Sequence, residues 1–374
     1  MSLPSLRVLM TVDAVGGVWV YATNLARSLC EQGCHVRLVT LGPPPRKDQL
    51  QAVGDLDLTV TDLALEWVDA EAHDHPRALE SLALIAQYFK PQVVHLNGYR
   101  EAAGEWNAPV LVVAHSCVRS WWRACRGEDP CEPRWLAYMS NVRAGLVTAD
   151  VWAAPTAAFR DTVQELYDPP TAGRVIWNGL DRRVGSTAKE PVILVAGRLW
   201  DEAKNVAAVA AIAARMPWPI RIAGPQRSAA TGDAAIAGAT QVQPLGELSH
   251  RDLMREMARA AIFVAPALYE PFGLTVLEAG LAGCALVLSD TASFRELWDG
   301  AALFVDPRDR SLLQSALVHL TRNDALRRDL QQRAASRAQC YSLAAMTDSY
   351  RRLYASMARS SDASRQWLLH EARP

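Results

Sequence analysis

Two glutamates and a glycine lie close together in the segment 268–278, which reads LYEPFGLTVLE. Glu270 and Glu278 are eight positions apart, and Gly273 stands between them after a proline and a phenylalanine. Proline and glycine allow a sharp turn into a helix, whose first N–H groups lack partners inside the helix and can bind phosphate. Those N–H groups would belong to Gly273, Leu274 and Thr275. A purely structural loop would leave both carboxylates beside an apolar wall without partners, so the pattern predicts a site for a phosphorylated ligand with hydroxyl groups.

Two cations follow the point where an apolar strand over 191–196 is expected to end. Arg198 stands in the sequence Gly-Arg-Leu, and Lys204 comes six positions later as one of only four lysines among 39 basic residues. A guanidinium and an ammonium group can together hold a diphosphate. A solvated pair of loop cations explains the same residues equally well, and the sequence leaves both interpretations open.

Further candidate positions follow expected strands in the first half of the chain. Gly16 and Gly17 precede an expected helix, where backbone N–H groups can approach a phosphate, although a plain tight turn is an equally good interpretation. They do not form a Gly-x-Gly-x-x-Gly fingerprint, so a dinucleotide is not indicated. His115 follows an apolar strand over 110–114, at the edge where parallel sheets bind ligands, although a lone histidine is more often structural.

Short apolar runs alternate with helical patterns along the chain, as in parallel sheets that helices cover on both faces. In the first half we expect strands at Leu6–Val12, Val36–Leu41, Val93–Leu96, Val110–Ala114 and Val151–Ala154, and helices at Val18–Gln32, Ala78–Phe89 and Arg134–Ala149. The pattern restarts with strands at Pro191–Ala196, Ile220–Ala223, Ala261–Ala265 and Ala285–Leu288, and helices at Lys204–Arg215, His250–Arg259 and Gly273–Ala282. The polar segment 178–190 is expected to link the halves. We therefore expect an α/β protein with domains at 1–177 and 191–342 and a ligand in the cleft between them.

Composition bounds the partners and the compartment. Of the 374 residues half are hydrophobic, and 39 basic against 40 acidic residues give a net charge of −1, which argues against nucleic acid as a partner. No apolar run is long enough to span a membrane, and the first residues lack a secretory pattern. We therefore expect a cytoplasmic protein, while peripheral contact with a membrane remains open. The seven cysteines form no Cys-x-x-Cys pair, and Asp55-Leu56-Asp57 reads as a strand edge, so no metal site is expected.

Taken together, these motifs resemble glycosyltransferase family 4, whose members are retaining enzymes with the GT-B fold. The resemblance extends over essentially the whole chain and is most specific in the second half. There it rests on Gly197-Arg198-Leu199, Lys204-Asn205, Leu245-Gly246, the stretch PALYEPFG at 266–273, Glu278-Ala279, Gly283 and Asp306-Pro307. In the first half, Gly16-Gly17, Gly33 and the stretch NGLD at 178–181 agree. The resemblance implies two Rossmann-like α/β/α domains that face each other across a cleft. A C-terminal helix at about 343–374 would cross back onto the N-terminal domain.

The resemblance also implies roles for individual residues. Arg198 and Lys204 would hold the donor diphosphate, Glu278 would bind the ribose, and Glu270 and His115 would lie near the transferred sugar. The donor-binding residues that it implies are Gly16, Gly17, Arg198, Lys204, Glu270, Gly273, Leu274, Thr275 and Glu278. The catalytic residues that it implies are Glu270, His115, Arg198 and Lys204. The implied reaction transfers a hexose from a UDP- or GDP-sugar to a hydroxyl with retention of the anomeric configuration, without metal or other cofactor. The acceptor, a saccharide, a lipid-linked sugar or a small molecule, stays open.

Segments 117–133 and 291–296 depart from the family pattern. In 291–296 only Glu296 agrees, and 117–133 (CVRSWWRACRGEDPCEP) has no counterpart. Trp121 and Trp122 are adjacent, so on a helix they cannot both face the core. We expect their rings to stack on the acceptor, with Asn97 as a further acceptor contact. The tryptophans beside apolar segments are instead expected in the core: Trp67, Trp135, Trp152, Trp177 and Trp218.

Other functions of the same fold stay open, namely a sugar-nucleotide epimerase, a phosphorylase, and a nucleotide-sugar-binding protein without activity. Pyridoxal phosphate chemistry would need a lysine in the second half, where Lys204 is the only one. A nicotinamide dehydrogenase would need the missing glycine fingerprint. Because Glu270, Glu278, Arg198 and Lys204 are all present, a glycosyltransferase is the favoured interpretation.

Overall fold

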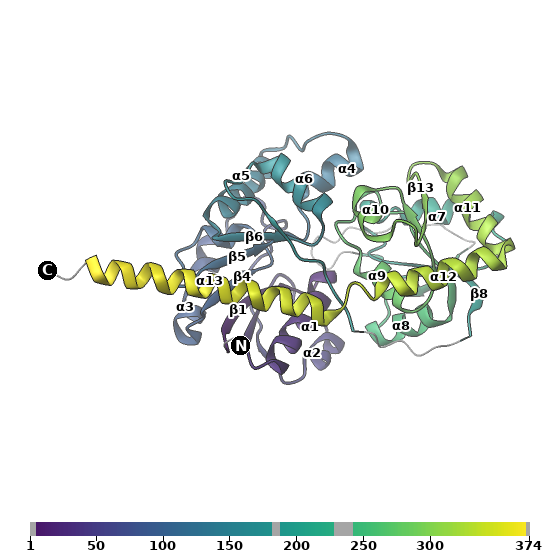
Figure 1. Ribbon diagram of the computed structural model, residues 1–374. Helices are drawn as coiled ribbons and strands as arrows, with labels where there is room; N and C mark the ends of the chain where they lie inside the picture. Colours follow the sequence, from purple (N-terminus) through teal and green to yellow (C-terminus); the bar gives the residue numbers. More distant parts are fainter. Residues whose placement is uncertain (1–4, 182–187, 228–241, 372–374) are drawn as a thin grey trace.

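The computed structural model describes residues 5–181, 188–227 and 242–371, with side chains described up to residue 360. Within these ranges the chain forms two α/β domains that lie side by side, and the C-terminal helix runs back along the first of them (Figure 1). The two-domain α/β architecture expected from the sequence is therefore confirmed.

The described part of the N-terminal domain is built on a parallel sheet. Its strands are β1 (Arg7–Asp13), β2 (His35–Leu41), β3 (Asp57–Thr59), β4 (Val93–Leu96), β5 (Val110–Val113), β6 (Val151–Ala154) and β7 (Arg174–Val175). They lie in the order β3-β2-β1-β4-β5-β6-β7. The surrounding helices are α1 (Gly17–Glu31), α2 (Lys47–Val53), α3 (His75–Phe89), the short 3₁₀ helix η1 (Arg100–Ala103), α4 (Val118–Arg126), α5 (Pro133–Thr148) and α6 (Ala157–Tyr167).

The second domain repeats this plan. Its strands are β8 (Glu190–Ala196), β9 (Ile220–Ala223), β10 (Gln243–Gly246), β11 (Ala260–Ala265), β12 (Ala285–Ser289) and β13 (Leu303–Val305), in the order β10-β9-β8-β11-β12-β13. Its helical elements are η2 (Glu202–Lys204), α7 (Val206–Ile212), η3 (Ala213–Arg215), α8 (His250–Arg259), α9 (Leu274–Leu281), α10 (Ala292–Trp298), α11 (Arg310–Arg322) and α12 (Asp324–Ala338). Central strands such as β4, β5 and β12 are buried throughout, which explains why their sequences are mostly apolar, with His95 and Ser289 as the polar exceptions.

The last helix, α13 (Leu343–Glu371), crosses back to the N-terminal domain (Figure 1). Met346, Tyr350 and Tyr354 are buried in one hydrophobic cluster with Trp19 and Tyr21 of α1. This confirms the crossing helix that the family resemblance implies.

The expected helix Lys204–Arg215 is interrupted. Lys204 ends the 3₁₀ turn η2, and α7 begins only after Asn205, whose φ is 50°. The side-chain amide of Asn205 donates to the backbone oxygens of Pro266 (3.0 Å) and Pro307 (2.8 Å). These two bonds hold Asn205 in a left-handed conformation that a continuous helix cannot accommodate. Lys204 is consequently presented from a turn.

Tryptophan positions also differ in part from the expectation. Trp177 is 47% exposed, so its assignment to the core is wrong, whereas Trp152 is fully buried. Trp67, Trp135 and Trp218 are partly buried against core clusters. Trp177 stands edge-on to Tyr341 and donates its indole N–H to Glu296 over 3.2 Å, which explains how a large ring follows a strand without entering the core.

The segment between the domains is anchored where it is described. The N–H of Leu180 donates to the oxygen of Tyr341, and the N–H of Leu343 donates to the oxygen of Leu180. The two chain crossings between the domains therefore run side by side. Residues 182–187 of the expected linker 178–190 lie outside the described residues.

Candidate functional site

A cleft of about 2460 Å³ lies between the two domains, where loops follow the carboxyl ends of the strands. Asp13, Asn97 and His115 reach it from β1, β4 and β5, while Arg198 and Glu270 reach it after β8 and β11. Pockets for one small molecule measure about 300–1,000 Å³, so this cleft has room for two substrates. All candidate residues named from the sequence line it: Gly16, Gly17, Asn97, His115, Trp121, Trp122, Arg198, Lys204, Glu270, Gly273, Leu274, Thr275 and Glu278.

The glycine loop of the N-terminal domain lies against Arg198 of the other domain. A Cβ atom on Gly16 would lie 2.5 Å from Nη1 of Arg198, and one on Gly17 would lie 3.4 Å from Cδ1 of Leu274. A side chain at position 16 would therefore occupy the place of the guanidinium group. Glycine here allows a backbone loop of one domain to meet a cation of the other.

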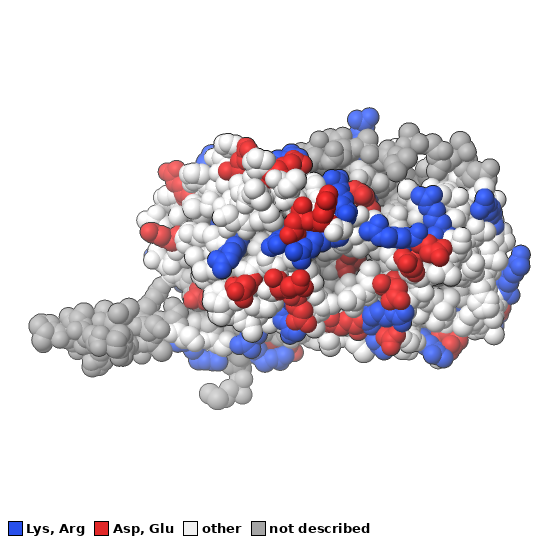
Figure 2. Space-filling view, turned by 90° about the horizontal axis from the view of Figure 1, so that it is seen from above, with Lys and Arg blue, Asp and Glu red and all other residues white. Residues whose placement is uncertain are grey.

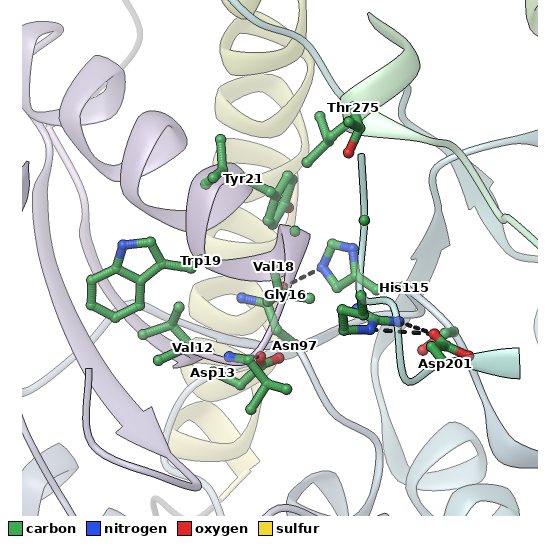
Figure 3. Close-up of a pocket in the computed structure, with 18 of the residues that line it drawn as sticks. Val12, Asp13, Gly16, Val18, Trp19, Tyr21, Asn97, His115, Asp201 and Thr275 are labelled. Atoms are coloured by element: carbon green, nitrogen blue, oxygen red, sulfur yellow. Dashed lines mark hydrogen bonds and ion pairs between the residues drawn. The ribbon is translucent and has the colours of Figure 1, made fainter. Parts of the chain in front are cut away.

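Arg198 is held by a carboxylate that the sequence reasoning missed. Its Nη2 donates to Oδ2 of Asp201 over 2.7 Å and its Nε over 3.3 Å (Figure 3). The Asp201 side chain is only 6% exposed, and its Oδ1 accepts N–H groups from Ala203 and from the indole of Trp121, each over 3.0 Å. Burial alone would raise the pKa of Asp201, but Arg198 and Lys204 lower it, so the carboxylate is ionised. Arg198 thus lies at the cleft with a charged partner.

Lys204 and Glu270 form an ion pair between two loops of the second domain. Their side chains are 20% and 19% exposed, and both line the cleft. The hydroxyl of Ser293 donates to the backbone oxygen of Glu270 over 2.5 Å and holds its loop. A cation and an anion thus neutralise each other at a position that borders open space.

The helix α9 begins at the cleft immediately after Gly273, whose φ is +84°. Glycine adopts this left-handed conformation without the cost that a Cβ atom brings. The N–H groups of Val276 and Leu277 already bond to the oxygen of Gly273. The preceding N–H groups, at Leu274 and Thr275, belong to the first turn, where no helical carbonyl lies within reach and an anion is favoured.

Glu278 is buried on α9 and bound to His250 of α8. Nε2 of His250 lies 2.7 Å from Oε1 of Glu278, whose side chain is 7% exposed. The hydrogen bond to Glu278 raises the pKa of His250. Together with the Lys204–Glu270 pair, this contact removes the argument that a purely structural loop would leave the two glutamates without partners, because each has a partner at a sequence distance that no local pattern reports.

His115 and Asn97 form a hydrogen-bonded unit at the cleft (Figure 3). Nε2 of His115 lies 2.8 Å from Oδ1 of Asn97, and the ring stands edge-on to Tyr21 at 4.5 Å between ring centroids. Burial and the neighbouring His95 lower the pKa of His115 to about 3. The imidazole is therefore neutral at physiological pH and suited to hydrogen bonding.

Within segment 117–133, Val118–Arg126 form α4, whose adjacent tryptophans Trp121 and Trp122 line the cleft. The two rings lie 5.9 Å apart, and the guanidinium carbon of Arg126 stands 4.2 Å from the ring centroid of Trp122. Trp121 is tied to the second domain through Asp201. Trp122 packs against Trp135 at 6.0 Å. The segment without a family counterpart therefore joins the two walls of the cleft, with both rings at its border.

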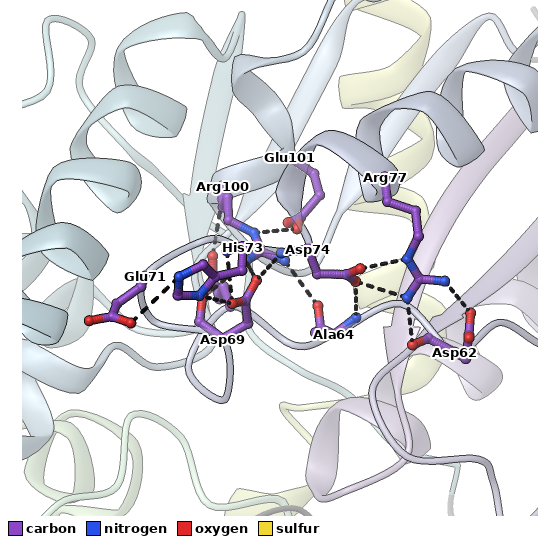
Figure 4. Close-up of polar contacts among 10 residues, drawn as sticks. Asp62, Ala64, Asp69, Glu71, His73, Asp74, Arg77, Arg100 and Glu101 are labelled. Atoms are coloured by element: carbon purple, nitrogen blue, oxygen red, sulfur yellow. Dashed lines mark hydrogen bonds and ion pairs between the residues drawn. The ribbon is translucent and has the colours of Figure 1, made fainter.

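Acidic side chains on the N-terminal wall were also missed. Oε2 of Glu66 accepts the N–H groups of Tyr99 and Arg100, each over 3.0 Å, and Glu66 lines the cleft. Burial and the charge of Glu101 raise the pKa of Glu66 to about 7. Behind this wall, Arg100 bonds to Asp69 and Glu101 and is 1% exposed (Figure 4). Glu66 stands before Trp67 in a loop without a recognisable sequence motif, so the sequence alone did not indicate that it lines the cleft.

The charges on the molecular surface are mixed. Figure 2 shows acidic and basic side chains interspersed over one face of the molecule, with neither sign gathered into a large patch there. Within the described residues, no three histidine, cysteine, aspartate or glutamate side chains gather in a way that would hold a metal ion. None of the described helices has both the length and the apolar character needed to cross a membrane.

Two parallel-sheet α/β domains that face one cleft define the fold as GT-B, which sucrose-phosphate synthase also has. The family model described as Glycosyltransferase Family 4 matches residues 15–184, and the model described as Glycosyl transferases group 1 matches residues 190–323. Together these two matches identify the chain as a GT-B glycosyltransferase of the family 4 type.

Individual relatives agree with this assignment. Alpha-maltose-1-phosphate synthase of Mycolicibacterium smegmatis is 25% identical over 322 residues, which cover 76% of this chain and 79% of that protein. O-antigen chain mannosyltransferase B of Escherichia coli is 32% identical over 101 residues, which span 27% of this chain and only 26% of that relative. Among solved structures, sucrose-phosphate synthase of Thermosynechococcus elongatus has a TM-score of 0.78 at 18% identity over 94% of this chain and 100% of that one. HepE of Anabaena in complex with UDP and glucose has a TM-score of 0.71 at 14% identity, with the same shares covered.

Proposed function

We propose that the chain is a retaining glycosyltransferase that transfers a hexose from a nucleotide-diphosphate sugar to a hydroxyl group of an acceptor. The observation that carries the proposal is the meeting of Arg198, the Gly16 loop and the first turn of α9 at one cleft. A diphosphate is bound by cationic side chains and by backbone N–H groups. A glycine lets the backbone approach closely, and the first turn of a helix offers N–H groups without partners. HepE, which shares the fold, binds UDP-glucose, and this supports a nucleotide sugar as the donor.

The donor would enter by exchanging ion partners. Its diphosphate would take the place of Asp201 on Arg198 and of Glu270 on Lys204, so the charge of each cation is balanced before and after binding. Arg198, Lys204 and the N–H groups of α9 would stabilise the leaving diphosphate as the glycosidic bond breaks, which is electrostatic catalysis without a metal ion. Glu270, released from Lys204, would lie near the sugar, and Glu278 would bind the ribose hydroxyls.

The acceptor would lie against the N-terminal wall. Trp121 and Trp122 line the cleft, and so does Asn97, which directly follows β4. Aromatic rings favour the apolar faces of a sugar or a lipid, so the acceptor is proposed to be a saccharide, a lipid-linked sugar or a small hydroxylated molecule. We expect Trp122→Ala to raise the KM for the acceptor more than the KM for the donor. An unchanged acceptor KM would assign Trp122 to packing alone.

The reaction is proposed to take place in the cytoplasm. All seven cysteines are free thiols, including the buried Cys117 and Cys125, which favours a reducing compartment.

The decisive experiment is a screen of UDP- and GDP-sugars by thermal shift and hydrolysis, followed by transfer to candidate acceptors with NMR of the anomeric product. Retention of configuration is expected, with activity unchanged by a chelator. Interconversion of sugars without acceptor would instead identify an epimerase. Binding without turnover against any acceptor would identify a binding protein, and no binding of any nucleotide sugar would refute the proposal.

A further inference from the structure

A buried chain of hydrogen bonds connects the crossing helix α13 to His115. The hydroxyl of Tyr354 lies 2.6 Å from Nδ1 of His95, and Nε2 of His95 lies 3.0 Å from Oδ1 of Asn97. The same Oδ1 lies 2.8 Å from Nε2 of His115. Tyr354 and His95 are fully buried, whereas His115 lines the cleft. The chain therefore starts 259 residues from His95 in the sequence and ends at the proposed donor site.

The protons in this chain can be assigned from the bonding partners alone. Nδ2 of Asn97 lies 2.6 Å from the backbone oxygen of Thr11, which can only accept, so the amide nitrogen must face Thr11 and Oδ1 must face the two histidines. Because Oδ1 can only accept, both histidines must carry a proton on Nε2, and the hydroxyl of Tyr21, which lies 3.4 Å from Nε2 of His95, must then accept at that nitrogen. Nδ1 of His95 then accepts the hydroxyl proton of Tyr354.

The same reasoning fixes the free face of His115. A neutral imidazole has one N–H group, and that of His115 is used by Asn97. Its Nδ1 is therefore a lone pair, and among the described residues no group bonds to it. Burial beside His95 keeps the pKa of His115 near 3, so a second proton does not reach Nδ1 at neutral pH.

We propose that Tyr354, His95 and Asn97 are positioning residues that hold His115 with its proton on Nε2, so that Nδ1 accepts a hydrogen bond from a hydroxyl group of the donor sugar. His115 then selects a hydroxyl group and discriminates against a donor in which fluorine or hydrogen replaces it, because neither can donate a proton. The sugar contact rests on the proposed function, whereas the proton assignment rests on the protein alone. Asn97, whose amide is already engaged by three partners, acts on His115 in this arrangement.

The proton assignment can be tested without a substrate. We would label the full chain with ¹⁵N-histidine and record long-range ¹H–¹⁵N correlation spectra between pH 8 and pH 5, with His115→Gln to identify the signals of His115 among the 8 histidines. The expected spectrum of His115 has a protonated Nε2 and an unprotonated Nδ1 and does not titrate in this range. A proton on Nδ1, or an imidazolium ion at pH 6, would overturn the assignment.

Two tyrosines on the same helix provide a matched pair of variants. Tyr354→Phe removes the hydroxyl bonded to Nδ1 of His95, so the Nδ1 signal of His95 should shift, and the signals of His115 should shift with it through the shared Oδ1 of Asn97. Tyr350 lies one turn earlier and is equally buried, but it contacts His95 through its ring at 5.4 Å, so Tyr350→Phe should leave both signals in place. Equal effects of the two variants would overturn the positioning chain.

The sugar contact has its own readout. Tyr354→Phe should weaken binding of UDP-glucose or GDP-mannose about threefold to tenfold, and binding of UDP or GDP by less than twofold, because only the sugar meets His115. Equal losses for nucleotide and nucleotide sugar would overturn the role of the chain at the sugar. Wild-type protein that binds neither nucleotide sugar would refute the proposed function together with the sugar contact, whereas the spectra would still decide the proton positions.

Discussion

Arg198 offers the sharpest test of the donor site. It makes two hydrogen bonds to Asp201 at 2.7 and 3.3 Å, and it lies against Gly16 at a place where a Cβ atom would not fit. A bound diphosphate would take over these N–H groups, and a hydrogen bond to a charged group contributes about 1.5–3 kcal/mol. Because the diphosphate displaces Asp201, losing the Arg198–Asp201 bonds offsets part of the binding free energy gained. The binding free energy lost in Arg198→Gln should therefore equal that of about one such hydrogen bond. This corresponds to a rise in the Kd of the nucleoside diphosphate of roughly 10- to 150-fold.

The assay is isothermal titration of UDP and of GDP into the wild type and Arg198→Gln at low and high salt. Arg221→Gln is a suitable control, since Arg221 is also a partly buried arginine of the second domain with carboxylate partners, Glu190 and Glu256, but it does not line the cleft. The control should retain the wild-type Kd. If Arg198→Gln binds the nucleoside diphosphate within twofold of the wild type, Arg198 does not hold the diphosphate and the reasoning fails. The loss should also shrink at high salt, because the interaction is between charges.

Three further predictions follow from the same contacts. Glu270→Gln should lower transfer by about 100-fold or more while the melting temperature and nucleoside diphosphate binding stay close to those of the wild type; unchanged turnover would remove Glu270 from the reaction. Arg100→Met should lower the free energy of unfolding by about 3–5 kcal/mol in urea titrations, because it leaves the 2%-exposed Glu101 without its counterion, while the exposed Arg77→Met should change it far less. The pKa of Glu66 is raised from 4.5 to about 7 in the folded protein, which binds more protons than the unfolded chain in this range. The free energy of unfolding should therefore fall as the pH rises from about 4.5 to about 7, and this slope should be smaller in Glu66→Gln; identical slopes would contradict the raised pKa.

Much of the fold was predictable because a strand buried on both faces has to be apolar throughout. The runs at Val110–Ala114 and Ala285–Leu288 fall on the fully buried strands β5 and β12 for this reason. The cleft was predictable by the same logic, since parallel strands end at one edge and residues such as His115 and Arg198 follow them directly.

What escaped prediction depends on partners far apart in the chain. The helix expected from Lys204 begins only after Asn205, because the side chain of Asn205 bonds to carbonyls 61 and 102 residues away. Glu270 has its partner 66 residues earlier. The local sequence around such residues is compatible with several backbone conformations, and only the tertiary contacts select one of them. The Asp201 carboxylate is an exception, since Arg198 is only three positions away and only its other side-chain partner, Trp121, comes from the other domain.

The loop that carries Glu270 is fastened to the N-terminal domain on both sides of the glutamate. The hydroxyl of Tyr269 accepts the N–H of Cys117 (3.2 Å) and lies 2.8 Å from the hydroxyl of Ser120, and the oxygen of Pro271 accepts the buried hydroxyl of Thr156 (2.9 Å). These bonds tie the position of Glu270 to the contact between the domains.

A different contact joins the domains at Arg46 and Glu247, which pair over 2.7 Å with side chains 47% and 44% exposed. Exposed ion pairs contribute about 0–1 kcal/mol, whereas separating the domains at Tyr269 and Thr156 would leave buried polar groups without partners, at about 1–3 kcal/mol each. Opening of the cleft should therefore begin at the Arg46–Glu247 contact and turn about the Glu270 loop. In such a motion the donor site would open to solvent. The loop that bears Glu270 would keep its position against the N-terminal wall of the cleft, where the acceptor is proposed to lie.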